Sequence, residues 1–182
     1  PGSWPIVAGV DGFFSELLGN GGAGADIMKG SFLSDRIIGG DGHDHITGAF
    51  YDESDYTYNA SRFRLCQNQK DLLTGGLGKD NFLIGALVNS YGINGANDYA
   101  VITDFGAGDR ISTALYRGDI IIEGTDGTLS LPATSTYAAT SIAYTARLFI
   151  DSDGSNTFTA TDELIAYVAG VQPTAANIVY GV

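Results

Sequence analysis

The stretch from Gly39 to Thr47, GGDGHDHIT, brings together residue types that suit a hard cation. Its glycines can take positive φ angles and let the backbone approach a ligand closely. Asp44 adds a carboxylate, and carboxylate oxygen is a preferred ligand of Ca²⁺. After this loop only Ile46 is apolar enough for the core, so we expect a short strand that buries one side chain. His43 and His45 have no third nitrogen or thiolate nearby, and they make a poor zinc site.

The same nine-residue pattern occurs five times in the chain. Full copies begin at Gly21, Gly39 and Gly75, and degraded copies begin at Gly30 and Cys66. The sixth residue of each copy is an aspartate: Asp26, Asp35, Asp44, Asp71 and Asp80. The eighth residue of each copy is apolar: Met28, Ile37, Ile46, Leu73 and Phe82. This period, with glycine, aspartate and an inward apolar residue at fixed places, is typical of calcium-binding β-helix repeats.

With this pattern, GGxGxDxUx where U is apolar, the chain resembles the RTX, or hemolysin-type calcium-binding, family over roughly residues 20–112. The resemblance implies an all-β fold: a right-handed parallel β-roll, or β-solenoid, in which two nonapeptides make one turn. It also implies several Ca²⁺ ions between stacked glycine loops, so Asp26 and Asp44, 18 residues apart, should share one ion. The glycines assigned to these sites by the resemblance are Gly22, Gly24, Gly40, Gly42, Gly76 and Gly78.

The other repeat aspartates are also metal ligands by the same resemblance. Asp80 has a partner at the 18-residue spacing in Asp98, although the residues before Asp98 lack the glycine pattern. Asp35 would need a partner at Glu53, which lies in a segment that departs from the repeat. Asp71 occupies the same place in its nonapeptide as Asp35 does.

The segment 98–111, DYAVITDFGAGDRI, resembles the element that closes the roll in this family. The resemblance implies Asp104 and Asp109 as the last ligands of the roll. In the alternative interpretation, both aspartates simply form turns.

A second calcium motif is predicted at DSDGSNTFTATDE, residues 151–163. Positions 1, 3, 5, 7 and 12 of an EF-hand-like loop are occupied by Asp151, Asp153, Ser155, Thr157 (through its carbonyl) and Asp162. The glycine falls at position 4 rather than 6, position 12 is Asp rather than Glu, and the flanking segments look like strands. The alternative is an acidic hairpin loop without a metal.

The composition indicates loops and metal-binding aspartates rather than helices. The net charge of −12 argues against nucleic-acid and anionic-membrane partners. Of the 21 acidic residues, 17 are Asp and four are Glu, whereas helix surfaces favour Glu. No apolar run approaches the roughly 18 residues of a membrane span.

Three regions are predicted along the chain. Residues 1–20 form an N-terminal cap, and residues 21–112 form the calcium-binding roll with an aromatic insertion at 49–65. Residues 113–182 form an antiparallel β cap that carries the extra calcium loop. Within this cap, residues 119–131 predict a hairpin with an Asp-Gly turn at Asp126 and Gly127.

Calcium is expected to supply the stability that the short strands lack. Each repeat buries about one side chain, worth roughly 1.5 to 3 kcal/mol. Ordering its backbone costs about 1 to 2 kcal/mol per residue. Ions that replace carboxylate repulsion with coordination would therefore drive folding.

The function predicted from these observations is a secreted, non-catalytic calcium-binding module that serves export and scaffolding. No nucleophile elbow, HExxH motif or phosphate loop is present. We expect a secreted or cell-surface location with bacterial type I-like export, and a chain that is processed or part of a longer protein. One alternative is a surface or polysaccharide-binding module, or a self-associating one, that uses the aromatic segment. Another is an accessory domain of a secreted hydrolase or epimerase.

Overall fold

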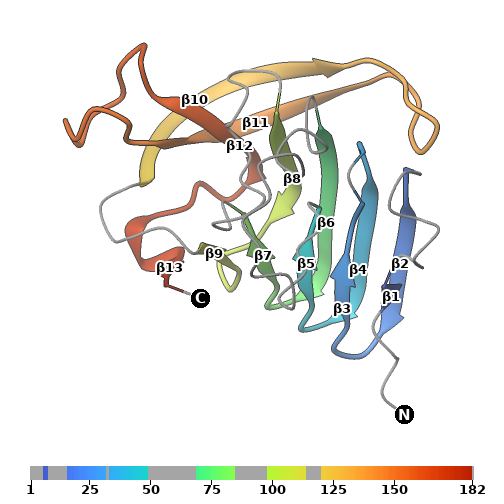
Figure 1. The fold of residues 1–182 in the computed structure, drawn as a ribbon. Helices are drawn as coiled ribbons and strands as arrows, with labels where there is room; N and C mark the ends of the chain where they lie inside the picture. The colour runs from blue at the N-terminus through green and yellow to red at the C-terminus, as the bar shows by residue number, and fades with distance from the viewer. Residues whose placement is uncertain are drawn as a thin grey trace, which may run out of the picture.

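The computed structural model describes residues 6–7 (backbone only), 16–31, 33–48, 69–84, 98–113 and 120–181 (Figure 1). These residues form thirteen β-strands and one 3₁₀ turn, Ala175–Asn177. The all-β class predicted from the sequence is therefore confirmed. Within these ranges no helix is long and apolar enough to cross a membrane.

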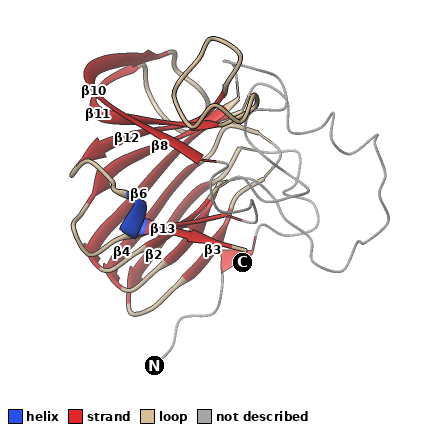
Figure 2. Cartoon of the chain, turned by 90° about the vertical axis from the view of Figure 1, so that its left-hand side faces the viewer, coloured by secondary structure: helices blue, strands red, loops and turns tan. Residues whose placement is uncertain are grey.

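The strands form two sheets. The six-stranded sheet holds, in spatial order, β1 (Ile6–Val7), β3 (Ile27–Lys29), β5 (His45–Thr47), β7 (Asn81–Leu83), β9 (Arg110–Thr113) and β13 (Ile178–Tyr180). The seven-stranded sheet holds β10 (Ile120–Leu131), β11 (Thr140–Ile150), β12 (Glu163–Gly170), β8 (Tyr99–Phe105), β6 (Lys70–Gly78), β4 (Arg36–Gly42) and β2 (Leu18–Ala23). Figure 2 shows the strands of the second sheet running side by side.

From β2 to β9 the chain alternates between the two sheets, and each strand from β2 to β7 pairs in parallel with the strand two places later. Leu18 pairs with Arg36, an offset of 18 residues that matches two nonapeptides. Arg36 pairs with Leu72, 36 residues later, and Lys70 pairs with Tyr99, 29 residues later. The alternation is consistent with the predicted β-roll, but only the first turn keeps the predicted spacing.

Each short strand of the six-stranded sheet contributes one side chain to the core. In β3 only the central Met28 is buried, with Ile27 exposed and Lys29 partly buried. The repeat pattern thus places its eighth residue between the sheets. The facing core residues are Met28, Ile46, Phe82 and Ile111 from one sheet and Ile37, Leu73 and Ile102 from the other.

The C-terminal strands extend both sheets. β11 pairs antiparallel with β10 on one side and with β12 on the other, and β12 then pairs in parallel with β8. β13 joins the other sheet beside β9. A second apolar cluster, which includes Leu72, Tyr99 and Phe149, packs this antiparallel part against β6 and β8.

The predicted hairpin turn at Asp126 and Gly127 is wrong. β10 continues through both residues, and its register against β11 shifts between Gly124 and Gly127. Gly127 lies opposite Tyr144, whose ring carbon Cε1 would be only 2.8 Å from a Cβ at position 127. The glycine therefore serves a bulge and a close side-chain approach rather than a turn.

The chain reverses instead at residues 132–139, and this tip reaches the first turn of the fold (Figure 1). The Ser135 backbone N–H donates to Glu16 Oε2 at 2.6 Å. The Tyr137 hydroxyl donates to the Lys70 carbonyl at 2.9 Å, and the Thr136 hydroxyl donates to the Ser34 carbonyl at 3.3 Å. The hairpin thus ties the C-terminal strands to β2, β4 and β6.

Candidate metal centre

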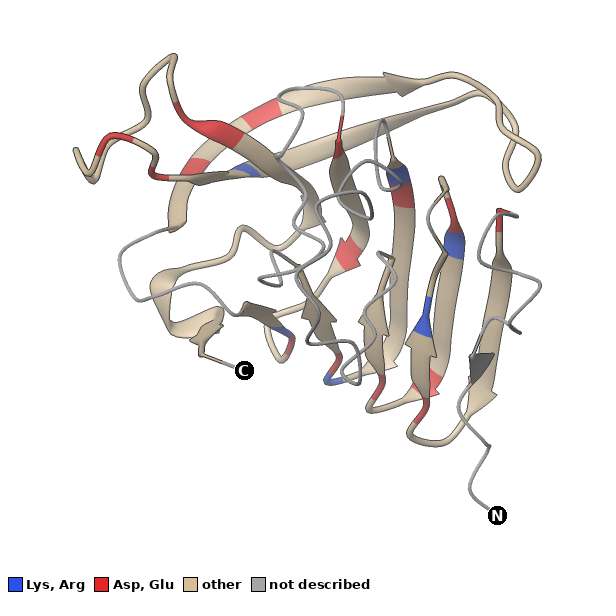
Figure 3. Ribbon diagram, in the orientation of Figure 1, with Lys and Arg blue, Asp and Glu red and all other residues tan. Residues whose placement is uncertain are grey.

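Three glycine loops, residues 21–26, 39–44 and 75–80, are stacked along one edge of the two sheets. Figure 3 shows acidic residues at these successive turns. Gly22, Gly40 and Gly76 are register partners, with φ angles of +92°, +110° and +96°. A Cβ on Gly40 would collide with the Gly22 carbonyl oxygen, and one on Gly76 would collide with that of Gly40. Only glycine therefore allows the loops to stack this closely.

A ladder of aspartates follows the loops. The Asp26 N–H donates to Asp44 Oδ1, the Asp44 N–H to Asp80 Oδ1, and the Asp80 N–H to Asp109 Oδ1, each at 2.9 Å. All four side chains are at most 5% exposed. The register of the sheets thus stacks one buried carboxylate per turn, and we call Asp26, Asp44, Asp80 and Asp109 the aspartate row.

The second carboxylate oxygen has no donor in three members of this row. Oδ2 of Asp26, Asp44 and Asp80 is buried and accepts no hydrogen bond in the part of the chain that the structure describes. At Asp109 the same atom accepts from the Gly106 N–H at 2.7 Å. A buried carboxylate oxygen without a partner costs free energy, and a cation removes that cost.

Electrostatics in the row favour a cation as well. Burial raises the pKa of Asp44 and of Asp80, and the charges of neighbouring row aspartates raise it further. The donors at hand are carboxylate and backbone carbonyl oxygens, which suit a hard ion such as Ca²⁺. These residues therefore fit the predicted metal.

Of the two pairs of neighbouring aspartates predicted for the row, the structure contains one. Asp26 and Asp44 are neighbours, as the 18-residue spacing predicts. The pairing of Asp80 with Asp98 is wrong, because Asp109 takes this place. The turn between Asn81 and Arg110 is 29 residues long, so a spacing of 18 no longer finds the partner.

Asp104 joins the third loop through hydrogen bonds. Its carboxylate accepts from the N–H groups of Gly75 and Gly76, both at 2.8 Å. These bonds fix the entry to the loop at residues 75–80. The structure thus brings Asp104 and Asp109 to the loop stack, and their role as ligands stays a prediction.

Asp35, Asp71 and Asp98 lie at the opposite edge of the sheets, where no full glycine loop occurs. The Asp35 carboxylate accepts from the Leu17 N–H at 2.5 Å, the Ser31 N–H at 2.5 Å and the Ser31 hydroxyl at 2.9 Å. The Asp35 N–H donates to Asp71 Oδ1 at 2.7 Å. Asp71 thus neighbours Asp35 in the structure, and Glu53, the partner predicted from spacing, lies outside the described residues. Hydrogen bonds thus satisfy the Asp35 carboxylate, and the role of Asp35, Asp71 and Asp98 as metal ligands stays a prediction.

Asp98 makes stability depend on pH. Burial raises the pKa of Asp98 to about 7, only partly offset by a hydrogen bond from the Gln69 backbone. The usual pKa of an aspartate is 3.8, so between about pH 4 and 7 the folded state holds a proton that the unfolded state has lost. Stability should therefore fall as pH rises through this window, by up to about 4 kcal/mol. Burial raises the pKa of Asp35 to about 6, which acts in the same direction.

Asp98→Asn should remove most of this pH dependence, because a neutral amide replaces the carboxyl group. Urea unfolding at pH 5 and pH 8 in saturating calcium would measure it, with Asp126→Asn on the exposed side of β10 as the control. A variant with the wild-type slope between the two pH values would contradict the assignment.

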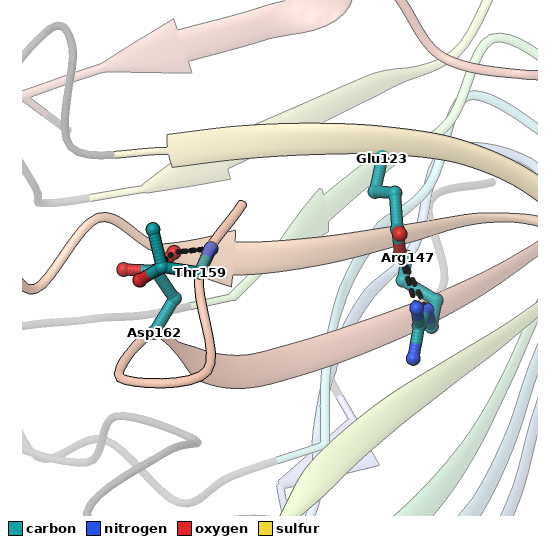
Figure 4. Close-up of polar contacts among 4 residues, drawn as sticks. All are labelled: Glu123, Arg147, Thr159 and Asp162. Atoms are coloured by element: carbon teal, nitrogen blue, oxygen red, sulfur yellow. Dashed lines mark hydrogen bonds and ion pairs between the residues drawn. The ribbon is translucent and has the colours of Figure 1, made fainter. Parts of the chain in front are cut away.

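The acidic loop between β11 and β12 gathers its predicted ligands. One carboxylate oxygen from each of Asp151, Asp153 and Asp162 lies within 4.8 Å of the others. Asp162 accepts a hydrogen bond from the Ser152 N–H at 3.0 Å. It also accepts one from the Thr159 N–H at 2.6 Å, which Figure 4 shows. Hydrogen bonds, chiefly from the Ser155 and Thr159 side chains, lower the pKa of Asp153 to about 2. The loop thus holds three carboxylates close together.

The backbone explains the unusual glycine position in this loop. Gly154, at position 4, has φ +71°, and Asn156, at position 6, has φ +57°. Asparagine takes this left-handed conformation more readily than most residues. Asn156 thus occupies the position where an EF-hand has glycine. The Ser155 hydroxyl donates to the Thr157 carbonyl at 2.8 Å, so both predicted ligands lie in the same turn.

A close ion pair joins β10 and β11. Arg147 contacts Glu123 through Nε at 2.6 Å and Nη2 at 2.5 Å (Figure 4). Arg147 also lies over the rings of Phe149 and Phe158. Glu123 is therefore not a candidate metal ligand.

Asp153→Asn should reduce the number of bound Ca²⁺ ions by one and leave the fold intact, because the side chain is exposed. Isothermal titration calorimetry on wild type and variant would count the ions. Asp126→Asn serves as the control for an equal change of charge. An unchanged stoichiometry would contradict a calcium site in this loop.

No family model matches the chain, and no curated protein matches it either. Among solved structures, it is similar to the solution structure of the AlgE6R3 subunit from the Azotobacter vinelandii mannuronan C5-epimerase. The two are 21% identical, the match covers 93% of each chain, and the TM-score is 0.42. At this level of similarity, any functional conclusion depends on the geometry of the aspartate row and of the acidic loop.

Proposed function

We propose that this chain is a non-catalytic, calcium-binding module of the RTX type, a right-handed parallel β-roll that folds when it meets extracellular calcium. One observation carries this proposal. Oδ2 of Asp26, Asp44 and Asp80 is buried among stacked glycine loops and lacks a hydrogen-bond donor in the described ranges. The repeats thus create a cost that a divalent ion relieves.

Two Ca²⁺ ions between the three glycine loops would satisfy these oxygens. Each ion would take carboxylate oxygen from successive members of the aspartate row and carbonyl oxygen from the glycines of the loops. Ca²⁺ fits this donor set because it takes six to eight oxygen ligands and tolerates irregular geometry. Mg²⁺ demands a smaller, near-octahedral arrangement and releases its water reluctantly. A third ion is proposed for Asp151, Asp153 and Asp162.

Calcium dependence would make folding of the module differ between the cytosol and the outside of the cell. Calcium sites of extracellular modules typically have dissociation constants of about 10⁻⁴ to 10⁻³ M. Such sites stay empty at cytosolic calcium and fill outside the cell, which favours an unfolded chain during export and a folded scaffold afterwards. We therefore propose a secreted or cell-surface location. The aromatic segment 49–65, on which the polysaccharide-binding alternative depends, lies outside the described residues.

Asp44→Asn tests the aspartate row directly. Asp44 lies between Asp26 and Asp80, and the variant keeps an oxygen that can accept the Asp26 N–H. We expect the calcium concentration at the midpoint of folding to rise roughly tenfold or more, because two ions lose a charged ligand. Circular dichroism during a calcium titration would measure the midpoint.

Asp41→Asn is the matched control, because Asp41 belongs to the same loop and its side chain is exposed. Its midpoint should stay within about twofold of the wild type, which is less than 0.5 kcal/mol. Equal midpoints for Asp44→Asn and Asp41→Asn would exclude the row as the calcium site.

A further inference from the structure

An open cleft of about 500 Å³ lies on the outer side of the six-stranded sheet, next to the third glycine loop. Its size falls within the range of small-molecule sites. We call it the outer cleft, and its lining includes His43, Lys79, Asn81, Arg110 and Ser112. These side chains play no part in the proposed calcium sites.

The repeat register builds the polar wall of the outer cleft. His45 pairs with Asn81, and Asn81 pairs with Arg110, on β5, β7 and β9. Their neighbours Ile46, Phe82 and Ile111 are buried between the sheets, so these polar side chains lie on the outer face. The equivalent residue in the first repeat is Ile27, which is exposed and uncharged. The cationic character therefore belongs to the later turns.

Two cations at the outer cleft have no partner in the described part of the chain. The Lys79 ammonium and the Arg110 guanidinium are exposed, and neither forms an ion pair or side-chain hydrogen bond there. The chain has only nine Lys and Arg against 21 acidic residues, so acidic partners are plentiful elsewhere. Two exposed cations that form no ion pair within the described residues of so acidic a chain favour an external anion.

The neutral residues of the cleft add hydrogen-bond donors. The Lys79 N–H donates to His43 Nδ1 at 2.9 Å, so the proton of the neutral His43 ring is on Nε2. Asn81 Oδ1 accepts from the Ser112 hydroxyl at 2.6 Å, which fixes the orientation of the Asn81 amide. The cleft thus combines an ammonium, a planar guanidinium and an imidazole N–H, the groups that bind oxyanions in proteins.

We propose that the outer cleft binds an oxyanion: the carboxylate, sulfate or phosphate group of a small ligand. Lys79 and Arg110 supply the charge, and His43 and Asn81 supply directed hydrogen bonds. Val179 adds an apolar side chain to the lining, which can contact the rest of the ligand.

The inference depends on the proposed function in one respect. Asp80 lines the cleft and belongs to the aspartate row, and Asp109 directly precedes Arg110. Their negative charges oppose an anion unless the row binds calcium. Calcium should therefore raise the affinity for the anion, and the anion should raise the affinity for calcium by the same factor.

The test uses the whole chain in saturating calcium, with bound calcium counted in the same sample. Glucuronate and phenyl sulfate are the probes, because both are monovalent anions with low affinity for free calcium, and glucose is the neutral match for glucuronate. Titration followed by ¹H–¹⁵N NMR should shift the amides of Lys79, Asn81 and Arg110 with at least one of the two anions and not with glucose. A response to glucuronate alone identifies a carboxylate ligand, and one to phenyl sulfate alone identifies a tetrahedral oxyanion.

The double variant that carries Lys79→Ala and Arg110→Ala should bind the anion at least tenfold more weakly and should bind the same number of Ca²⁺ ions. Lys70→Ala, which removes a cation from β6 in the other sheet, should change the affinity for the anion less than twofold. Equal responses to glucose and to both anions, or full binding by the double variant, would overturn the proposal. A chain that binds no calcium but still binds the anion would contradict the proposed function and leave the outer cleft in place.

Discussion

Removal of calcium should unfold the part of the chain that carries the glycine loops, β2 to β7. An ion present at 100 times its dissociation constant contributes about 2.7 kcal/mol, so two ions contribute about 5 kcal/mol. That amount equals the total stability of many small domains. In the six-stranded sheet, the strands involved are three residues long and bury one apolar side chain each, which is a small contribution to stability.

Hydrogen exchange with and without a calcium chelator would measure this effect. Amide exchange in β4 and β6 should accelerate roughly a hundredfold per ion lost. β11 and β12 contribute Leu148, Phe149 and Leu164 to two apolar clusters, so their amides should keep more protection. Magnesium at the same concentration serves as the control and should not restore the protection. Equal protection in chelator and in calcium would contradict calcium-driven folding.

Gly40→Ala should destabilise the calcium-loaded protein by about 4 kcal/mol or more, a loss seen only when a specific feature of the fold is broken. Gly40 has φ +110°, which strains any residue with a Cβ. The added methyl group would also collide with the carbonyl oxygen of Gly22. Since backbone rather than a flexible side chain is in the way, the two loops must separate. Chemical denaturation in saturating calcium would measure the loss.

Gly22→Ala is the matched control within the same column of glycines. Its φ angle is +92°, but a Cβ at this position has no atom within 4 Å. It should therefore lose only the backbone strain, about 1 to 2 kcal/mol. Similar losses in the two variants would show that the loops are not stacked closely enough to share ions.

The nonapeptide pattern was sufficient to predict the inner core and the first turn. Met28, Ile46 and Phe82 are buried between the sheets because side chains alternate along each strand, and aspartate follows each loop at a constant distance. The partnership of Asp26 and Asp44 follows from the same regular period. These features depend on local sequence repeated in register, which a single chain displays directly.

Other features depend on contacts that no local pattern records. The neighbour of Asp80 is Asp109 rather than the predicted Asp98. The turn from Asn81 to its register partner Arg110 is longer than two nonapeptides. Asp126 and Gly127 resemble a hairpin turn, but pairing with β11 keeps them within a strand. At Asp35, the Leu17 and Ser31 N–H groups donate hydrogen bonds to the carboxylate, and spacing alone cannot reveal these donors.

The acidic loop at residues 151–163 could not be assigned from its sequence for a different reason. Its glycine is two positions early for an EF-hand, position 12 is Asp and the flanking segments look like strands, so a loop without metal stayed open as the alternative. The structure places Asn156 in the left-handed conformation at the expected position. An asparagine at position 6 was the available signal, since this residue tolerates positive φ.

The most direct test of the account is anomalous diffraction at a wavelength sensitive to calcium, on crystals grown in calcium. We predict an anomalous peak between the loops at residues 21–26 and 39–44, within bonding distance of Oδ2 of Asp26 and of Asp44. A well-ordered loop pair with no peak, and with these two carboxylate oxygens satisfied by water or protein donors, would contradict the account.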